Sequence, residues 1–300
     1  MKPIHIAFIL LIDFLWAFNI VAIKESVLAM PPLLSVALRY GLVLLVCASS
    51  IHIIEGRMAL ILLTGVVTGA LQFGLGAYSY HVATNLSALA IAGQLGVPLS
   101  LLLAIAIDGE RIAWKRTAGI LLAVLGVMLL VFDPRIADER LGIFLTFGAA
   151  TCWASGNLLF RRLSGIPVLT LYGWQAVVSI PILIVASHVF EPGGIAGLPD
   201  VPLSAFAWIA YSAIAASLIG HAGMAWLLQR YPVTVITPFT LPTPMLAVMF
   251  ATLVYGTAVT PLMWVGGALT IAGVAIITLR TAKKSVEAKP VTASEGKHAQ

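Results

Sequence analysis

A repeat that spans half of the sequence constrains the fold of this chain more than any other feature. Three glycines recur after a constant interval of 147 residues: Gly109, Gly119 and Gly126 return as Gly256, Gly266 and Gly273. In each copy a short turn leads into an uninterrupted apolar run that ends at charged residues, as a membrane helix does. We therefore expect two copies of one structural unit.

Composition places this unit in a lipid bilayer. Hydrophobic residues make up 60% of the 300 residues and charged residues only 10%, whereas soluble domains contain about 25% charged residues. The pI near 9.4 could indicate nucleic-acid binding, but the basic residues lie between apolar runs without an interleaved aromatic patch, so we expect no nucleic-acid partner. Cys47 and Cys152 lie inside apolar runs, which leaves no paired cysteines for a metal site.

Ten apolar runs are long enough to cross a membrane, at about 20 residues each. They cover residues 4–23, 33–51, 59–80, 86–107, 117–132, 141–160, 168–189, 203–228, 233–254 and 261–279. The predicted fold class is an all-α integral membrane protein with ten transmembrane helices. We expect two five-helix repeats, residues 1–137 and 138–280, and a disordered cytoplasmic tail at 281–300.

The Lys and Arg residues predict the orientation of these helices. With the N-terminus inside, only Lys24, Arg135 and Arg140 fall on the outer side, and the other basic residues outside the spans are cytoplasmic. Both termini are therefore expected in the cytoplasm of a cell with a bacterial-type inner membrane. Because each unit has an odd number of spans, the second unit enters the membrane inverted. Inverted repeats are typical of secondary transporters, whose substrate site lies near the midplane between the halves.

Several motifs, spread from about residue 4 to residue 279, carry a family resemblance. They are Leu15-Trp16-Ala17-Phe18-Asn19 with Lys24, Met30-Pro31-Pro32, Leu38-Arg39-Tyr40, Gly109-Glu110-Arg111 with Gly119 and Gly126, and Trp153-Ala154-Ser155-Gly156-Asn157. Together they resemble the EamA-type family of the drug/metabolite transporter superfamily. The second copy departs from the family at Gly256-Thr257, where Gly-Glu is frequent.

The resemblance implies an architecture and an activity. It implies two EamA domains, a central cavity lined mainly by spans one, three, four, six, eight and nine, and export of amino acids or related small metabolites. The implied partners are a small-molecule substrate and the lipid bilayer.

Two titratable residues inside spans are candidates for proton coupling. Asp13 lies near the middle of the first span, where a carboxylate is costly unless it faces water, a partner or a proton. It could bind the coupling proton or a substrate amino group, or it could be a neutral, hydrogen-bonded residue that fixes helix packing. His221, in the eighth span, is the second candidate, because imidazole titrates near neutral pH.

Aromatic and amide side chains are candidates for substrate contact. The aromatic set is Trp16, Tyr78, Tyr80 and Trp153, which could stack on an apolar or aromatic group. Trp16 and Trp153 hold corresponding positions in the two units. Asn19 and Asn157 follow these tryptophans closely and could bind a polar end of the substrate or join helices to one another.

Spans four and nine are predicted to be broken near mid-depth by glycine and proline. Pro98 and Pro244 are expected to act as hinges, with Gln94 and Thr240 as polar substrate contacts beside the break. A kink that serves packing alone is the alternative.

Two cations also fall inside or at the ends of spans. Arg39 could extend outward, bind a substrate carboxylate, or pair with helix ends or with Asp13. We expect the structural pairing, because span two is expected at the periphery. Lys24 is expected to be an anchor at the membrane interface.

The sequence lacks the signatures of other functional classes. It has no phosphate-binding Gly-x-x-x-x-Gly-Lys-[Ser/Thr] loop and no nucleophile with its base or metal-ligand cluster, so we expect no enzyme activity, cofactor or metal. The predicted function is a secondary transporter that exports amino acids or related metabolites by alternating access, coupled to protons, as a monomer or dimer. A drug or lipid exporter of the same fold and an uncoupled small-solute channel are the alternatives.

Overall fold

The structure is a computed structural model that describes residues 2–108, 114–228, 230–231 and 236–287. Every regular element within these ranges is helical. Within the described part of the chain, nine helical stretches are long and apolar enough to cross a membrane, and Thr243–Tyr255 is a shorter apolar helix. Helices satisfy all of their backbone hydrogen bonds internally, which a chain in lipid requires. The predicted all-α membrane fold of about ten helices is confirmed.

The first half contains spans one to five. Its elements are α1 (Pro3–Ala29), α2 (Pro32–Cys47), η1 (Ala48–Ser50), α3 (Met58–Thr64), η2 (Gly65–Leu71), α4 (Gln72–Val82), α5 (Leu86–Ala92), η3 (Gly93–Leu95), α6 (Gly96–Asp108) and α7 (Trp114–Val131). The third span is continuous through α3, η2 and α4, and the fourth through α5, η3 and α6.

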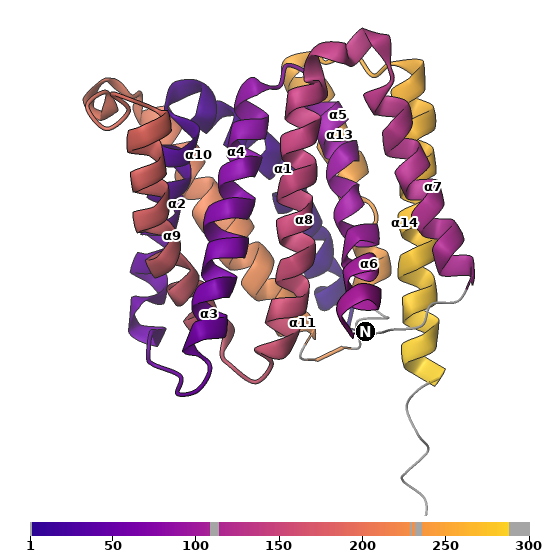
Figure 1. The fold of residues 1–300 in the computed structure, drawn as a ribbon, viewed down its shortest axis with the longest axis horizontal. Helices are drawn as coiled ribbons and strands as arrows, with labels where there is room; N and C mark the ends of the chain where they lie inside the picture. The colour runs from indigo at the N-terminus through magenta and orange to yellow at the C-terminus, as the bar shows by residue number, and fades with distance from the viewer. Residues whose placement is uncertain (1, 109–113, 229, 232–235, 288–300) are drawn as a thin grey trace, which may run out of the picture.

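The second half repeats this pattern. Its elements are η4 (Pro134–Glu139), α8 (Arg140–Arg162), α9 (Val168–Phe190), η5 (Leu198–Asp200), α10 (Leu203–Tyr211), η6 (Ser212–Ala222), α11 (Gly223–Leu228), η7 (Thr237–Thr240), α13 (Thr243–Tyr255) and α14 (Pro261–Glu287). The helices stand side by side, and the start of α1 lies at the same end of the bundle as the last turn of α14 (Figure 1).

The repeated glycines lie where the two halves meet along α7 and α14. A Cβ on Gly119 would come within 2.9 Å of the Gly273 carbonyl oxygen, and one on Gly273 within 2.5 Å of the Gly119 carbonyl oxygen. Gly126 and Gly266 show the same reciprocal contact, at 2.4 and 2.5 Å. The early glycine of one helix thus contacts the late glycine of the other. Equivalent helices therefore run antiparallel, as an inverted repeat requires, and the small residues allow their backbones to touch.

A second pair of equivalent positions distorts the third and eighth spans. The π-helical turn η2 begins at Gly65 and the π-helical turn η6 begins at Ser212, an interval of 147 residues that equals the interval between the repeated glycines. A π-helical turn widens the helix and is frequent at functional sites. Both turns face the space between the halves that is described below.

Glutamates hold two helix N-termini. The Glu191 carboxylate accepts hydrogen bonds from the Leu33 and Leu34 amides at the start of α2, at 2.9 and 3.4 Å. Glu139 likewise accepts a hydrogen bond from the Asn85 amide, at 2.8 Å, just before α5. The free amides and the positive end of each helix dipole stabilise such a carboxylate. In both cases the second half of the chain caps a helix of the first half.

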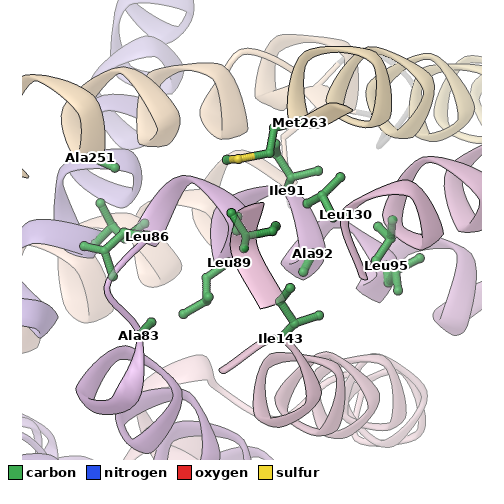
Figure 2. Close-up of a cluster of buried hydrophobic side chains, with 14 of the residues drawn as sticks. Ala83, Leu86, Leu89, Ile91, Ala92, Leu95, Leu130, Ile143, Ala251 and Met263 are labelled. Carbon is green, nitrogen blue, oxygen red and sulfur yellow. The ribbon is translucent and has the colours of Figure 1, made fainter. Parts of the chain in front are cut away.

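The largest buried apolar cluster joins both halves. It surrounds α5, and Figure 2 shows Leu86, Leu89 and Ile91 of this helix close to side chains from other elements. The partners include Leu130 from α7 and Met263 from α14, which are fully buried. Dispersion contacts drive helix packing inside a bilayer, where lipid is as apolar as the side chains. The cluster includes Ile143 of α8, whereas Thr146, Ala149 and Ala150 of the same helix line the cavity described below.

Two boundaries differ from the sequence expectation. The first span continues to Ala29 instead of residue 23, because no helix breaker occurs before Met30-Pro31, where proline disfavours further helix. Helix α14 continues to Glu287, because neither glycine nor proline interrupts residues 281–287. We predicted these residues to belong to a disordered tail. The remainder of that tail, 288–300, and the start of the ninth span at 233–235 lie outside the described residues.

Candidate functional site

A cavity of about 360 Å³, lined by both polar and apolar side chains, lies between the two halves, within the size range of small-molecule sites. We call it the main cavity. Its lining residues are Ile23, Ser26, Ser35, Val36, Arg39, Gln72, Phe73, Gly76, Ala77, Tyr80, Gly93, Gln94, Thr146, Ala149, Ala150, Trp153, Ile209 and Ser212. Spans one, two, three, four, six and eight therefore contribute to the wall.

This wall differs from the one that the family resemblance implies. Span two, which we expected at the periphery, supplies Ser35, Val36 and Arg39. Among the described residues, span nine supplies none, so Thr240 does not line the cavity. Span two lies at the cavity wall and not at the periphery, because α2 packs against α9 and against η6 of the opposite half.

Arg39 is the one charged side chain among the residues that line the main cavity. It lies at the middle of α2, and only 5% of it is exposed. Its guanidinium donates hydrogen bonds to the Ser217 hydroxyl, from Nε at 3.1 Å and from Nη2 at 2.6 Å. It also stacks over the Phe73 ring at 4.3 Å. The expected pairing with helix ends or with Asp13 is wrong, because Arg39 points across to η6 of the other half.

A hydrogen-bonded chain continues from Ser217 along η6. The Ser217 hydroxyl donates to the Ser212 carbonyl at 2.9 Å, five residues back in the π-helical turn. The Ser212 hydroxyl in turn donates to the Asn19 amide oxygen at 2.6 Å. Asn19 is thus fixed behind the wall by Ser212 and does not line the cavity itself. This chain holds Arg39 in a defined position without a counterion from the described residues.

A smaller compartment of about 150 Å³ adjoins the main cavity. We call it the side pocket. It shares Gln72, Phe73 and Trp153 with the main cavity, and its other lining residues are Tyr40, Val43, Thr68, Gly156, Asn157, Phe160, Tyr172, Gln175, Ser217 and His221. Span seven enters the wall here through Tyr172 and Gln175.

Four of the eight predicted substrate contacts lie on these walls. Tyr80 and Gln94 line the main cavity, Asn157 lines the side pocket, and Trp153 lines both. The Trp153 indole packs on Gly96, where a Cβ would lie 2.8 Å from the ring. No hydrogen bond fixes the Gln94 amide within the described part of the chain, so it is available to a ligand.

The other predicted substrate contacts lie elsewhere. The Trp16 indole donates to the Ala216 carbonyl at 3.1 Å and packs behind His221, with the ring centres 5.0 Å apart. Tyr78 packs in an apolar cluster beside α2. Trp16 and Trp153 therefore have different surroundings although they hold corresponding positions, because only the first is covered by η6.

The two proton-coupling candidates lie in different surroundings. His221 lines the side pocket and stacks near Tyr172, with ring centres 6.2 Å apart. Asp13 lies outside both compartments and is 1% exposed. Its Oδ1 accepts a hydrogen bond from the Thr243 hydroxyl at 2.9 Å, whereas its Oδ2 has no partner. No Lys, Arg or His among the described residues pairs with it.

Span nine is interrupted at the predicted place, whereas span four stays helical throughout and only tightens to a 3₁₀ turn there. The 3₁₀ turn η3 ends just before α6, and Pro98 lies in the first turn of that helix. The 3₁₀ turn η7 precedes α13, and Pro244 is the second residue of α13. At Pro244 the missing amide costs no hydrogen bond, since the first amides after a break would be free in any case, whereas Pro98 removes a donor within a continuous helical stretch. Motion at these prolines stays a prediction.

Lys24 is not the interfacial anchor that we expected. Its ammonium donates to the carbonyls of Tyr80 and Ala83, at 2.8 and 2.7 Å, and Lys24 is 8% exposed. Because α1 continues for five residues beyond it, Lys24 lies inside the bundle and caps the C-terminal carbonyls of α4. It thereby fixes Tyr80 at the cavity wall.

Sequence reasoning missed several residues of the site. Gln72, Phe73, Ser217 and Gln175 were not singled out, although Gln175 follows Arg39 by 136 residues, close to the 137 residues that separate Trp153 from Trp16, and thus corresponds to Arg39 in the second repeat. That correspondence was the available signal. The described residues contain no group of three or more His, Cys, Asp or Glu that could hold a metal ion.

Comparisons with known proteins show the family of the chain. The sequence matches the model of the EamA-like transporter family over residues 3–132 and 140–279. It is 28% identical to a "Probable amino-acid metabolite efflux pump" of Escherichia coli K12, over 89% of this chain and 92% of the relative. It is also 28% identical to a "Probable terminal-alkyne amino-acid exporter" of Streptantibioticus cattleyicolor, over 69% of this chain and 68% of that one.

A solved crystal structure has a similar fold. Its TM-score is 0.55 at 16% identity, with 95% of this chain and 99% of that chain covered. At this identity the similarity concerns the arrangement of helices alone.

Proposed function

Because the chain belongs to the EamA-like transporter family, we propose that it exports amino acids or related carboxylate-bearing metabolites through the main cavity by alternating access. It is a multi-pass protein of the inner membrane. Relatives named for the efflux of amino-acid metabolites support this substrate class. The observation that carries the proposal is the Arg39 guanidinium, which faces the cavity without a carboxylate partner among the described residues.

A buried guanidinium needs an anion or several hydrogen-bond acceptors. Ser217 supplies one acceptor oxygen, and the Phe73 ring covers one face of Arg39. An intramembrane charge is retained at a cost of several kcal/mol, so it marks a functional position. A substrate carboxylate completes the site by a charge-assisted hydrogen bond to the remaining donors.

The rest of the wall suits the neutral and cationic parts of an amino acid. The Gln72 and Gln94 side chains line the cavity, and their amide oxygens can accept from an ammonium group. The main cavity has no Asp or Glu among its described lining residues. A net positive wall disfavours bulky organic cations, which argues against the drug-exporter alternative.

Alternating access and proton coupling complete the proposal. Rocking of one half against the other around the α7–α14 contact exposes the site to each side in turn, with bending at the turns η3 and η7. Asp13 is the proposed proton carrier, because a bare, buried carboxylate oxygen is costly to charge in this conformation. The cytoplasmic position of both termini, which rests on the distribution of basic residues, belongs to the same proposal.

Transport by purified protein in proteoliposomes tests the substrate class. We expect labelled amino acids to exchange with unlabelled ones in saturable counterflow, which a channel does not show. The matching amines that lack the carboxylate, and carboxyl methyl esters, should compete at least tenfold less well. Equal competition by acids and amines contradicts the proposal.

Variants of Arg39 and of its partner Ser217 then separate the effect of the Arg39 charge on substrate preference from the effect of its position. Arg39→Gln removes the charge and should abolish the preference for carboxylates, whereas Arg39→Lys should retain part of it. Ser217→Ala is the matched control, because it removes the hydrogen bond that positions Arg39 but leaves its charge. A Ser217→Ala variant that keeps the acid-over-amine preference locates that preference in the guanidinium.

A further inference from the structure

The side pocket differs from the main cavity, because two of its lining residues carry buried oxygen atoms that have no hydrogen-bond partner. Four buried side-chain oxygens among the described residues lack a hydrogen bond: Asp13 Oδ2, Tyr40 Oη, Gln175 Oε1 and Thr252 Oγ1. Tyr40 and Gln175 both line the side pocket, whereas Asp13 and Thr252 line neither compartment. Such atoms are rare in folded proteins, since each costs about 1–3 kcal/mol. Two at one pocket point to an occupant.

The amide of Gln175 is held in a fixed orientation by its neighbours. The Thr68 hydroxyl donates its one proton to the Thr64 carbonyl at 2.7 Å. Thr68 Oγ1 can therefore only accept from Gln175, which donates through Nε2 at 2.8 Å. This pairing leaves Gln175 Oε1 as an acceptor without a donor. Gln175 is 4% exposed, so bulk water does not replace the missing donor.

Tyr40 complements this acceptor. Its ring packs edge-on against Phe73, with ring centres 5.9 Å apart, and its side chain is 3% exposed. Its phenol hydroxyl can both donate and accept a hydrogen bond. The residues of the pocket wall thus carry one obligate acceptor and one hydroxyl without partners, and neither residue carries a full charge.

A hydroxyl group matches this pair. It donates one proton to Gln175 Oε1 and accepts a hydrogen bond from Tyr40 with a lone pair. An apolar group of the same size leaves both atoms unpaired in a buried place, and sites of this kind discriminate strongly against analogues that lack the polar group. The pocket volume of about 150 Å³ far exceeds the ~10–15 Å³ that a single water needs.

We propose that the side pocket is a side-chain subsite that selects hydroxyl-bearing amino acids, with Tyr40 and Gln175 as the specificity-determining residues. The inference rests on the proposed function, in which Arg39 binds the substrate carboxylate. Arg39 lies next to Tyr40 in the chain, and its partner Ser217 lines the side pocket. The three residues Gln72, Phe73 and Trp153 border both compartments, so one small substrate can reach both.

L-Threonine and L-valine test this subsite directly, because they have the same shape and differ by a hydroxyl in place of a methyl group. The experiment measures counterflow of each labelled amino acid in proteoliposomes, together with the thermal shift that each produces in the detergent-purified protein. The wild type should prefer threonine by about tenfold, as expected for one to two hydrogen bonds. The thermal shift should follow the same order.

Two near-isosteric variants assign the preference to the proposed residues. Tyr40→Phe removes only the phenol oxygen, and Gln175→Met removes the acceptor. Each should bring the threonine-to-valine ratio to within about twofold of one. Thr252→Val is the matched control, since it removes another unpaired buried hydroxyl that lines neither compartment. Its ratio should equal that of the wild type.

The outcomes distinguish this inference from the function on which it rests. A wild-type ratio near one, with both amino acids transported, overturns the subsite and leaves the amino-acid assignment standing. A tenfold ratio that survives in both Tyr40→Phe and Gln175→Met also overturns it. Absence of transport and of a thermal shift with every amino acid tested overturns the proposed function and the subsite together.

Discussion

Arg39 and Gln175 hold corresponding places in the two repeats, and each donates a hydrogen bond to a hydroxyl on the π-helical turn of the opposite half. Arg39 Nη2 lies 2.6 Å from Ser217 Oγ in η6, and Gln175 Nε2 lies 2.8 Å from Thr68 Oγ1 in η2. The two halves therefore meet at a pair of equivalent polar crossings around the cavity. One crossing carries a positive charge and the other is neutral, so a symmetric scaffold presents an asymmetric binding surface.

The contact between α7 and α14 should tolerate no added side chain. In Gly126→Val, the new Cβ would lie 2.4 Å from the Gly266 carbonyl oxygen, and backbone must move to relieve the clash. We expect a loss of about 3 kcal/mol, at the upper end of overpacking costs, seen as a lower melting temperature in detergent. Gly41→Ala, where no atom lies within 4 Å of the new Cβ, serves as control and should melt as the wild type does.

The Lys24 ammonium should matter for stability far more than a surface lysine. Lys24→Met leaves the Tyr80 and Ala83 carbonyls without their donor, at a cost of about 2–4 kcal/mol for two buried acceptors. The melting temperature reports the loss, and Lys115→Met, at an exposed position, is the control. If Lys24 were only an interfacial anchor, both substitutions would lower the melting temperature by equal, small amounts.

The sequence predicted those features that depend on local hydrophobicity. The spans follow from apolar runs, the 3₁₀ turns in spans four and nine from Gly93, Pro98 and Pro244, and the inverted arrangement from an odd number of crossings. Each of these is a property of a short segment or of a count. The structure describes them at the predicted places, with ends shifted by a few residues.

The side-chain contacts between different spans could not be predicted in this way. Arg39 was recognisable as an intramembrane cation, but its partner Ser217 lies 178 residues away. Lys24 has the sequence context of an interfacial anchor, and only the extra length of α1 places it inside. The partnerless state of Tyr40 and Gln175 depends on which atoms neighbouring helices leave unpaired, which no local pattern encodes.

The proline in the first turn of α6 should affect the rate of transport and not affinity. Pro98→Ala restores a backbone amide beside the 3₁₀ turn η3 and favours a continuous helix across it. We expect the maximal counterflow rate to fall several-fold while the half-saturating substrate concentration stays unchanged. Pro181→Ala, inside α9 and away from both compartments, is the control. A changed half-saturating concentration in Pro98→Ala argues for a binding role instead.

Asp13→Asn should uncouple transport from the proton gradient without stopping exchange. Asparagine has the shape of the protonated carboxylic acid, so its oxygen can still accept from Thr243 and the bundle should fold. If Asp13 binds the proton in one conformation and releases it in another, an imposed pH gradient drives wild-type accumulation but no longer drives the variant. Counterflow at equal pH, which needs no net proton movement, should persist. Gradient-driven accumulation that is unchanged in Asp13→Asn assigns the coupling proton elsewhere, and His221→Gln then becomes the variant to measure, since that imidazole lines the side pocket.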